Sequence, residues 1–166
     1  ARYQAAAAAA TATRARISVK TNTVVMPYNV DELPRFAELT RHHPRLITRF
    51  IEHMPFDGNS WSPSSMIPYS AMLDALSTHF NCPTLPRVAS SDPSDTTRHH
   101  RVPGFAGRVG FITSMSKPFC GGCNRVRVTA DGGLKVCLFG EEEVSLRDVM
   151  RGGGGDGEME EVVRRA

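Results

Sequence analysis

The chain has 166 residues, a mass of 18.2 kDa and a net charge of +3, so it can form one domain but not a large multidomain machine. Of its residues 40% are hydrophobic, but 16 of these are Ala and 9 of the 16 lie in the first 15 positions. No apolar run approaches the roughly 20 residues that cross a bilayer, and the small charge excludes a general nucleic-acid coat. We expect a soluble chain with neither a membrane nor a nucleic acid as partner.

The first part of the chain predicts alternating strands and helices. Residues 1–16 form an Ala-rich, low-complexity segment that is typical of a helix or of a transit-like peptide. Residues 17–26 alternate β-branched and polar side chains, which predicts a strand. Asp31 can cap a short helix that ends before Pro44 and buries one face, formed by Leu33, Phe36, Ala37 and Leu39.

A second strand and helix follow. Residues 46–54 predict a strand and residues 55–67 a loop with Trp61 as a packing anchor. Pro68 suits the start of a helix that has apolar residues at spacings of three and four, namely Met72, Leu73, Leu76 and Phe80. This order predicts parallel β/α units over residues 17–80.

From residue 81 on, the sequence predicts loops and short strands instead of β/α units. Residues 81–110 predict a long loop in which the pair His99-His100 is exposed to water. Within residues 111–151 we expect short strands, a hairpin at Asp131-Gly132, and a helix over 145–150 capped by Ser145. Residues 152–166 form a Gly-rich and then charged tail, in which residues 152–155 break the preceding helix and residues 158–166 are expected to be frayed.

Three of the four cysteines are close in sequence. Cys120 and Cys123 are separated by Gly121 and Gly122, which remove side chains that could obstruct a metal centre, and a hairpin can bring Cys137 back to them. The spacing is compatible with a redox pair, with a zinc site completed by His99, His100 or Cys82, or with an iron-sulfur cluster that has one open iron. The spacing alone does not separate zinc from iron.

Two arginines follow this motif. Arg125 and Arg127 occupy alternate positions of an expected strand, so both side chains lie on one face. A guanidinium group suits phosphate oxygens, which beside a metal centre favours a nucleoside triphosphate as ligand; a solvated strand face is the alternative.

Residues 104–151, which include GFITSMSKPFCGGCNRVRVTADGGLKVCLFG, resemble the C-terminal region of the GTP 3′,8-cyclase family, also called the molybdenum cofactor biosynthesis protein A family. The resemblance extends upstream through residues 19–22, 29–33 and 49–69, so it covers most of residues 17–151. It implies a lyase of the radical S-adenosylmethionine class, built as an incomplete (β/α)6 TIM-like barrel with a cluster-binding β-hairpin region. Such an enzyme cyclises GTP to (8S)-3′,8-cyclo-7,8-dihydroguanosine 5′-triphosphate in molybdenum cofactor biosynthesis.

The resemblance also implies roles for single residues. Ligands of a second [4Fe-4S] cluster, which binds GTP, would be Cys120, Cys123 and Cys137. Contacts to GTP would come from Lys20, Arg49, Arg125, Val126 and Arg127, and Met54 would lie beside S-adenosylmethionine. Without the resemblance, Lys20 would be a solvated edge residue, Met54 a core residue and Arg49 the partner of Glu52 in an ion pair.

The chain departs from the family pattern in its cysteines. The 166 residues contain no Cys-x3-Cys-x2-Cys motif for the first cluster and end at Arg165-Ala166 rather than in a Gly-Gly tail. We therefore expect a part of the enzyme that is inactive alone; the alternative is a non-catalytic zinc- or cluster-binding nucleotide module.

The resemblance further bears on partners and compartment. It allows a homodimer and implies that cyclic pyranopterin monophosphate synthase acts on the product. The expected compartment is reducing: the mitochondrial matrix in a eukaryote, the cytoplasm in a bacterium.

Overall fold

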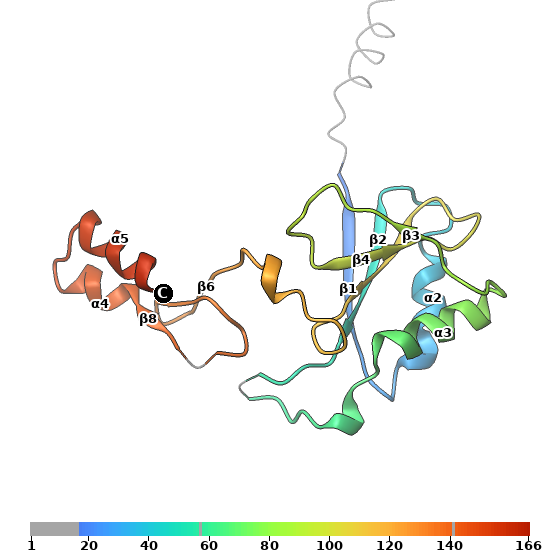
Figure 1. Cartoon of the computed structure of the whole chain (residues 1–166), viewed down its shortest axis with the longest axis horizontal. Helices are drawn as coiled ribbons and strands as arrows, with labels where there is room; N and C mark the ends of the chain where they lie inside the picture. The colour runs from blue at the N-terminus through green and yellow to red at the C-terminus, as the bar shows by residue number, and fades with distance from the viewer. Residues whose placement is uncertain (1–16, 57, 141) are drawn as a thin grey trace, which may run out of the picture.

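The computed structural model describes residues 17–56, 58–140 and 142–166, so the Ala-rich segment lies outside the described residues. The described chain has two parts (Figure 1), a sheet body of residues 17–117 without 57 and a C-terminal lobe of residues 118–166 without 141. Their elements are β1 (Val19–Val25), η1 (Val30–Glu32), α2 (Leu33–Glu38), β2 (Leu46–Glu52), η2 (Pro63–Ser65), α3 (Tyr69–His79), β3 (Arg87–Val88), β4 (Thr97–His100), β5 (Arg108–Ile112), η3 (Cys120–Gly122), β6 (Arg127–Val128), β7 (Gly133–Lys135), β8 (Val144–Ser145), α4 (Leu146–Arg151) and α5 (Asp156–Arg165).

The sheet body contains a five-stranded sheet in the order β1-β2-β5-β4-β3. β1, β2 and β5 are parallel neighbours, whereas β4 and β3 run antiparallel to their neighbours. The expected parallel units are therefore confirmed for β1 and β2, and the fold is mixed α/β. The expected loop over 81–110 is wrong in part, because β3 and β4 extend the sheet through residues that are mostly polar and carry a weak strand signal.

One face of this sheet packs on α2 and α3. Alternation along β2 turns Thr48, Phe50 and Glu52 toward the helices, and all three are fully buried. Phe50 meets Phe111 of β5 at 5.8 Å between ring centroids, inside a cluster that includes Leu33 of α2. Leu39, which was expected on the buried face, is 50% exposed because α2 ends at Glu38.

Asp31 does not cap α2 with its side chain. It lies inside the 3-10 turn η1, and the N-cap of α2 is Glu32, whose side chain makes no cap hydrogen bond. The helix that follows Pro68 begins at Tyr69 as expected, with Met72 and Leu76 buried. Trp61 is half-buried and donates from Nε1 to the His53 carbonyl, 3.0 Å away.

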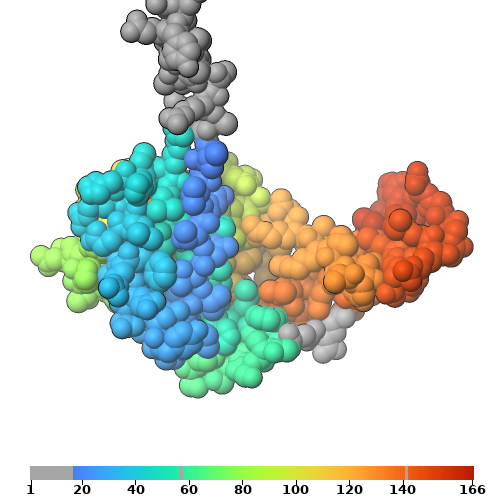
Figure 2. All heavy atoms as spheres, turned by 180° about the vertical axis from the view of Figure 1, so that it is seen from behind, coloured from blue at the N-terminus to red at the C-terminus, as the bar shows by residue number. Residues whose placement is uncertain are grey.

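The C-terminal lobe stands beside the body in the space-filling view (Figure 2). It carries the small antiparallel sheet β6-β7-β8, in which Arg127 pairs with Lys135 and Val128 with Leu134. Gly132 has φ +87°, so the expected turn at Asp131-Gly132 is confirmed at a position where the left-handed backbone favours glycine. The Ser145 hydroxyl accepts from the Asp148 amide and caps α4, again as expected.

The end of the chain is more regular than its composition suggests. α5 spans ten residues, and Arg164 forms an ion pair with Glu160 at 2.6 Å, one turn apart. Val162 of the same helix is 8% exposed. The expected frayed stretch over 158–166 is therefore wrong, because all of these residues but the last lie in α5.

Candidate functional site

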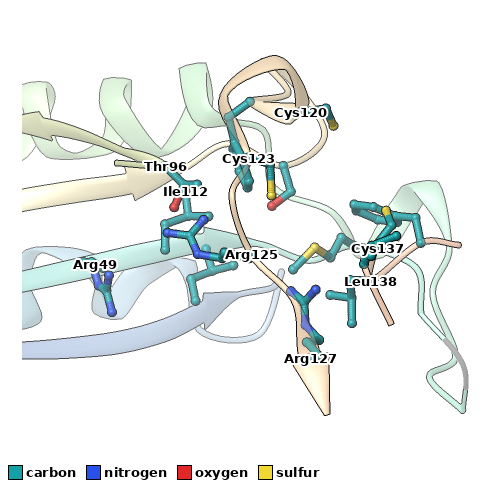
Figure 3. A pocket seen from close by; sticks show the side chains of 15 residues that line it. Arg49, Thr96, Ile112, Cys120, Cys123, Arg125, Arg127, Cys137 and Leu138 are labelled. Atoms are coloured by element: carbon teal, nitrogen blue, oxygen red, sulfur yellow. The ribbon is translucent and has the colours of Figure 1, made fainter. Parts of the chain in front are cut away.

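A cavity of about 480 Å³ lies between the sheet body and the C-terminal lobe (Figure 3). On one side are the carboxyl ends of β2 and β5, and on the other are the loop around η3 and the residues that follow β7. Ligands of open α/β sheets bind at such strand ends. The lining residues are Arg49, Ile51, Met54, Thr96, Ile112, Ser114, Phe119, Cys120, Cys123, Arg125, Arg127, Val136, Cys137, Leu138 and Phe139.

The three clustered cysteines all line this cavity. Cys120 belongs to η3, where the Cys123 amide donates to the Cys120 carbonyl at 3.1 Å and closes a turn. Cys137 comes from the strand side, two residues after β7. All three thiols are free and exposed. In Figure 3 the Cys123 side chain points into the cavity, while Cys120 lies at its rim.

These thiols do not form a ready-made site for a single metal ion. Within residues 17–56, 58–140 and 142–166, no three His, Cys, Asp or Glu side chains are grouped closely enough to hold one. Among the described lining residues the metal-binding side chains are nevertheless the three cysteine thiols, with the hydroxyls of Thr96 and Ser114 beside them and without a carboxylate or an imidazole. A tetrahedral zinc ion needs a fourth ligand that this lining does not supply, whereas three thiolates are compatible with a four-iron cluster.

The glycines between Cys120 and Cys123 are not required by crowding. A Cβ atom at Gly121 would meet nothing within 4 Å, and one at Gly122 would make an ordinary contact with the Pro93 carbonyl at 3.6 Å. These contacts concern protein atoms alone, so the expectation that the glycines make room for a metal centre stays a prediction.

Three arginines give the cavity its charge. Arg49, Arg125 and Arg127 line it, and no acidic residue among residues 17–56, 58–140 and 142–166 does. Arg49 Nε donates to Asn22 Oδ1 at 2.8 Å, which fixes the guanidinium on the open face of the sheet. Gly110 lies opposite Arg49 in the β2–β5 register, and a Cβ atom there would be 3.4 Å from Arg49 Cγ. The Cβ atom would also overlap Thr97 Cγ2 of β4, so the missing side chain at Gly110 makes room chiefly for Thr97 and only secondarily for Arg49.

The other expected ligand-binding residues divide between the cavity and the surface. Met54 lines the cavity two residues after β2. Lys20 is exposed on the edge strand β1, beside Ile47 and outside the cavity lining. Val126 is 63% exposed and is likewise absent from the lining, since it alternates with the two arginines.

His99 and His100 are not an exposed loop pair. Both lie in β4 and are 6% and 4% exposed. His99 Nε2 is 2.7 Å from Asp95 Oδ2, and His100 Nδ1 donates to the Leu85 carbonyl at 2.8 Å. Cys82 donates to the Thr84 carbonyl. None of the three lines the cavity, so the structure does not bring the expected fourth zinc ligand to the clustered thiols.

Glu52 is a structural residue that the sequence reasoning missed. Its buried carboxylate accepts from the amides of Tyr69, Met115 and Ser116, each at 2.8 Å, and from the Ser116 hydroxyl. It therefore joins the end of β2 to the start of α3 and to the loop after β5. The expected Arg49–Glu52 pair is wrong, because residues three apart in a strand face opposite sides. The sequence did contain a signal for the burial of Glu52, because Glu52 continues the alternation that turns Thr48 and Phe50 toward the helices.

Asp95 supplies a second carboxylate, close in sequence to the cavity-lining Thr96. Burial raises the pKa of Asp95, but hydrogen bonds from the Thr97 amide, His99 and Ser90 outweigh burial and hold that pKa well below its usual range. Asp95 therefore remains an anion that orders the segment before β4, next to the cavity-lining Thr96.

In the part of the chain that the structure describes, no helix has the length and apolar character needed to cross a bilayer.

Comparison with known proteins agrees with the resemblance. Residues 46–166 match the family Molybdenum Cofactor Synthesis C. The chain is 50% identical over 149 residues to Molybdenum cofactor biosynthesis protein 1 of Homo sapiens, covering 89% of this chain and 23% of that protein.

Relatives from a plant and a bacterium are similar over the same region. GTP 3′,8-cyclase, mitochondrial, of Arabidopsis thaliana is 46% identical, with 89% of this chain and 37% of that protein covered. GTP 3′,8-cyclase of Pelotomaculum thermopropionicum is 39% identical, with 89% and 45% covered. The chain thus spans between about a quarter and under a half of the length of these relatives. The chain belongs to the Molybdenum Cofactor Synthesis C family, and it corresponds to the C-terminal region of the GTP 3′,8-cyclases.

Proposed function

We propose that this chain forms the GTP-binding part of a GTP 3′,8-cyclase that acts in molybdenum cofactor biosynthesis. The observation that carries the proposal is that three free thiols and three arginines line one cavity, with no acidic side chain from the described part of the chain among them. The relatives named GTP 3′,8-cyclase support GTP as the substrate.

Cys120, Cys123 and Cys137 would hold a [4Fe-4S] cluster at the inner end of the η3 loop. Three thiolates on a four-iron cluster leave one iron free, and that iron would supply a coordination position for the guanine when the cluster is bound. All three thiols are exposed and free of disulfide bonds. They are therefore available as cluster ligands, which supports this assignment.

The arginines would bind the triphosphate. A guanidinium group offers a planar fork of donors that matches phosphate oxygens. Arg125 and Arg127 approach from the lobe and Arg49 from the sheet, so an anion between them would be held from both parts of the molecule. Met54, at the end of β2, would lie beside S-adenosylmethionine.

We assign the step that starts the radical reaction to a part of the enzyme outside these 166 residues. Hydrogen abstraction in this enzyme class needs S-adenosylmethionine on a cluster held by Cys-x3-Cys-x2-Cys, a motif that the sequence lacks. The chain would therefore bind and orient GTP without turning it over alone. Lys20 and Val126 remain proposed GTP contacts that would require a ligand larger than the cavity or a change of conformation.

The test is anaerobic reconstitution of the chain with iron and sulfide. We expect about four iron atoms per chain and a paramagnetic resonance signal of the reduced sample that GTP perturbs. The variant Cys137→Ala should lose most of the iron, whereas the matched control Cys82→Ala should retain it. One zinc per chain without iron would instead support the non-catalytic zinc module.

A second test separates GTP binding from cluster binding. The double variant Arg125→Ala/Arg127→Ala should bind GTP at least about tenfold more weakly while keeping its iron. The control Arg35→Ala/Arg101→Ala removes the same charge from exposed positions outside the cavity lining and should leave the affinity unchanged. Equal affinity in both double variants would contradict the role given to the arginines.

A further inference from the structure

Ser114 carries a buried hydroxyl that has no partner. The residue is 7% exposed and lies two positions after the end of β5. Its Oγ is inaccessible to solvent and makes no hydrogen bond to any described residue, yet Ser114 lines the cavity. A buried hydroxyl without a partner is costly and rare, so it points to a missing ligand.

The hydroxyls next to Ser114 are satisfied. Thr113 Oγ1 accepts from Arg98 Nε at 3.1 Å and donates to the Lys117 carbonyl at 2.8 Å. The Ser116 hydroxyl donates to Glu52. Ser114 is therefore an exception within its own loop, and a general shortage of partners does not explain it.

The backbone on both sides of Ser114 is fixed. The amides of Met115 and Ser116 donate to Glu52 Oε2, and the Lys117 amide donates to the Thr113 carbonyl at 3.2 Å. These bonds hold the loop before any ligand arrives, so the Ser114 hydroxyl is preorganised for binding.

The position of Ser114 in the cavity identifies the part of the ligand that it meets. Ile112, two positions before Ser114, pairs with Ile51 of β2, and both side chains line the cavity, so the sheet side offers an apolar surface beside Arg49. Arg125 is exposed and lines the cavity from the lobe. A triphosphate carries the charge and suits the arginines, whereas an uncharged ring system with a few polar atoms suits the buried apolar wall.

We propose that the Ser114 hydroxyl forms a hydrogen bond with the nucleoside half of the bound nucleotide and so selects for it over other polyphosphates. The inference rests on the proposed function, because it requires that a nucleoside triphosphate occupies this cavity. It adds a positioning contact on the sheet side that is separate from the thiols and from the arginines.

The experiment measures binding of GTP and of inorganic tripolyphosphate to the iron-reconstituted chain by equilibrium dialysis. We expect Ser114→Ala to weaken GTP binding about fivefold to tenfold and to leave tripolyphosphate binding unchanged. The matched control Ser70→Ala, at an exposed position of α3, should change neither affinity. The thermal midpoint of the ligand-free Ser114→Ala chain should equal or exceed that of the wild type, because the variant removes an unsatisfied group.

The outcomes separate the two proposals. If the wild-type chain binds GTP and Ser114→Ala binds it equally well, only the role of Ser114 is overturned. An equal loss for GTP and tripolyphosphate would mean a phosphate contact and also overturns the assignment. A lower midpoint of the ligand-free variant would mean a structural role, which the proposal excludes. If the wild type binds no GTP, the proposed function itself fails, and the role of Ser114 fails with it.

Discussion

The sheet body and the C-terminal lobe are stabilised in different ways. The body has a continuous core around Phe50 and Phe111, packed between the sheet and two helices. Among the described residues of the lobe, only Leu134 and Val162 are buried hydrophobic side chains, and Val128, Phe139 and Met150 are between 46% and 69% exposed. The lobe also carries the three exposed thiols. The contrast shows that most of the buried apolar side chains belong to the body, and we expect the lobe to gain stability if it binds the proposed cluster.

The largest expected effect tests the core of the body. Phe50→Ala should lower the free energy of unfolding by about 3–5 kcal/mol, because it opens a cavity beside Phe111 in the centre of the sheet. Urea unfolding followed by circular dichroism measures this change. The same truncation at the exposed Phe56 should cost little; a similar loss at both sites would contradict the assignment of the core.

The next effect concerns the link between the body and the cavity. Glu52→Ala should cost about 3 kcal/mol, since it leaves the amides of Tyr69, Met115 and Ser116 without their acceptor. It should also weaken GTP binding, because the loop that carries Ser114 loses its anchor. Unfolding in urea and equilibrium dialysis measure the two effects, with the exposed Glu32→Ala as control. Unchanged stability would show that the carboxylate is not the anchor of this loop.

A smaller effect should be confined to the lobe. Leu134→Ala should destabilise β6 and β7 by about 2 kcal/mol while leaving the parallel strands unaffected. Hydrogen exchange measures both regions in one sample: amides of the lobe should exchange faster than those of β2 and β5, and faster still in the variant. Reconstitution with iron should slow exchange in the lobe. Equal protection of both parts in the metal-free chain would remove the contrast between them.

The smallest effect is a pH dependence within the body. Burial lowers the pKa of His100, against a raising effect of its bond to the Leu85 carbonyl. Nδ1 donates to that carbonyl, so the neutral ring accepts at Nε2 from the Tyr69 hydroxyl, 2.9 Å away. A folded-state pKa below the unfolded value means that stability is complete above about pH 6.5 and falls as the pH drops below it.

The variant His100→Gln isolates this effect. Its free energy of unfolding should decrease less than that of the wild type between about pH 7.5 and pH 5.5, as measured by urea titrations at each pH. The exposed His42→Gln should keep the wild-type slope. A parallel decrease in His100→Gln and wild type would assign the pH dependence to other groups.

Much of the fold was predictable because its signals are local. Alternation predicted β1 and β2, spacings of three and four predicted α3, and Asp131-Gly132 predicted the turn of the β6–β7 hairpin. β3 and β4 were missed because most of their residues are polar, and because β3 pairs with β4 and β4 with β5 across loops rather than across a tight turn. α5 was missed because glycines precede it and its stability comes from paired charges.

The site was predictable to the extent that its residue types are unusual. Three thiols and Arg125 with Arg127 stand out in a sequence, and the structure brings them to one cavity with Arg49 and Met54. Ser114 does not stand out, because a single serine carries no pattern and its significance depends on the absence of a partner in three dimensions. Lys20 was assigned through the resemblance, and the structure leaves it on the exposed edge strand.

The Glu52 carboxylate also determines the order in which the molecule can assemble. Its bonds to Met115 and Ser116 connect residues 63 and 64 positions apart in the chain, and contacts over such separations form late because a long loop must close first. During synthesis, the Glu52 carboxylate could therefore accept from the Tyr69 amide before β5 has emerged, but not yet from Met115 and Ser116. We expect the loop of Ser114 to be among the last parts of the body to acquire its native hydrogen bonds on refolding, so that the cavity forms only in a chain whose sheet is already complete.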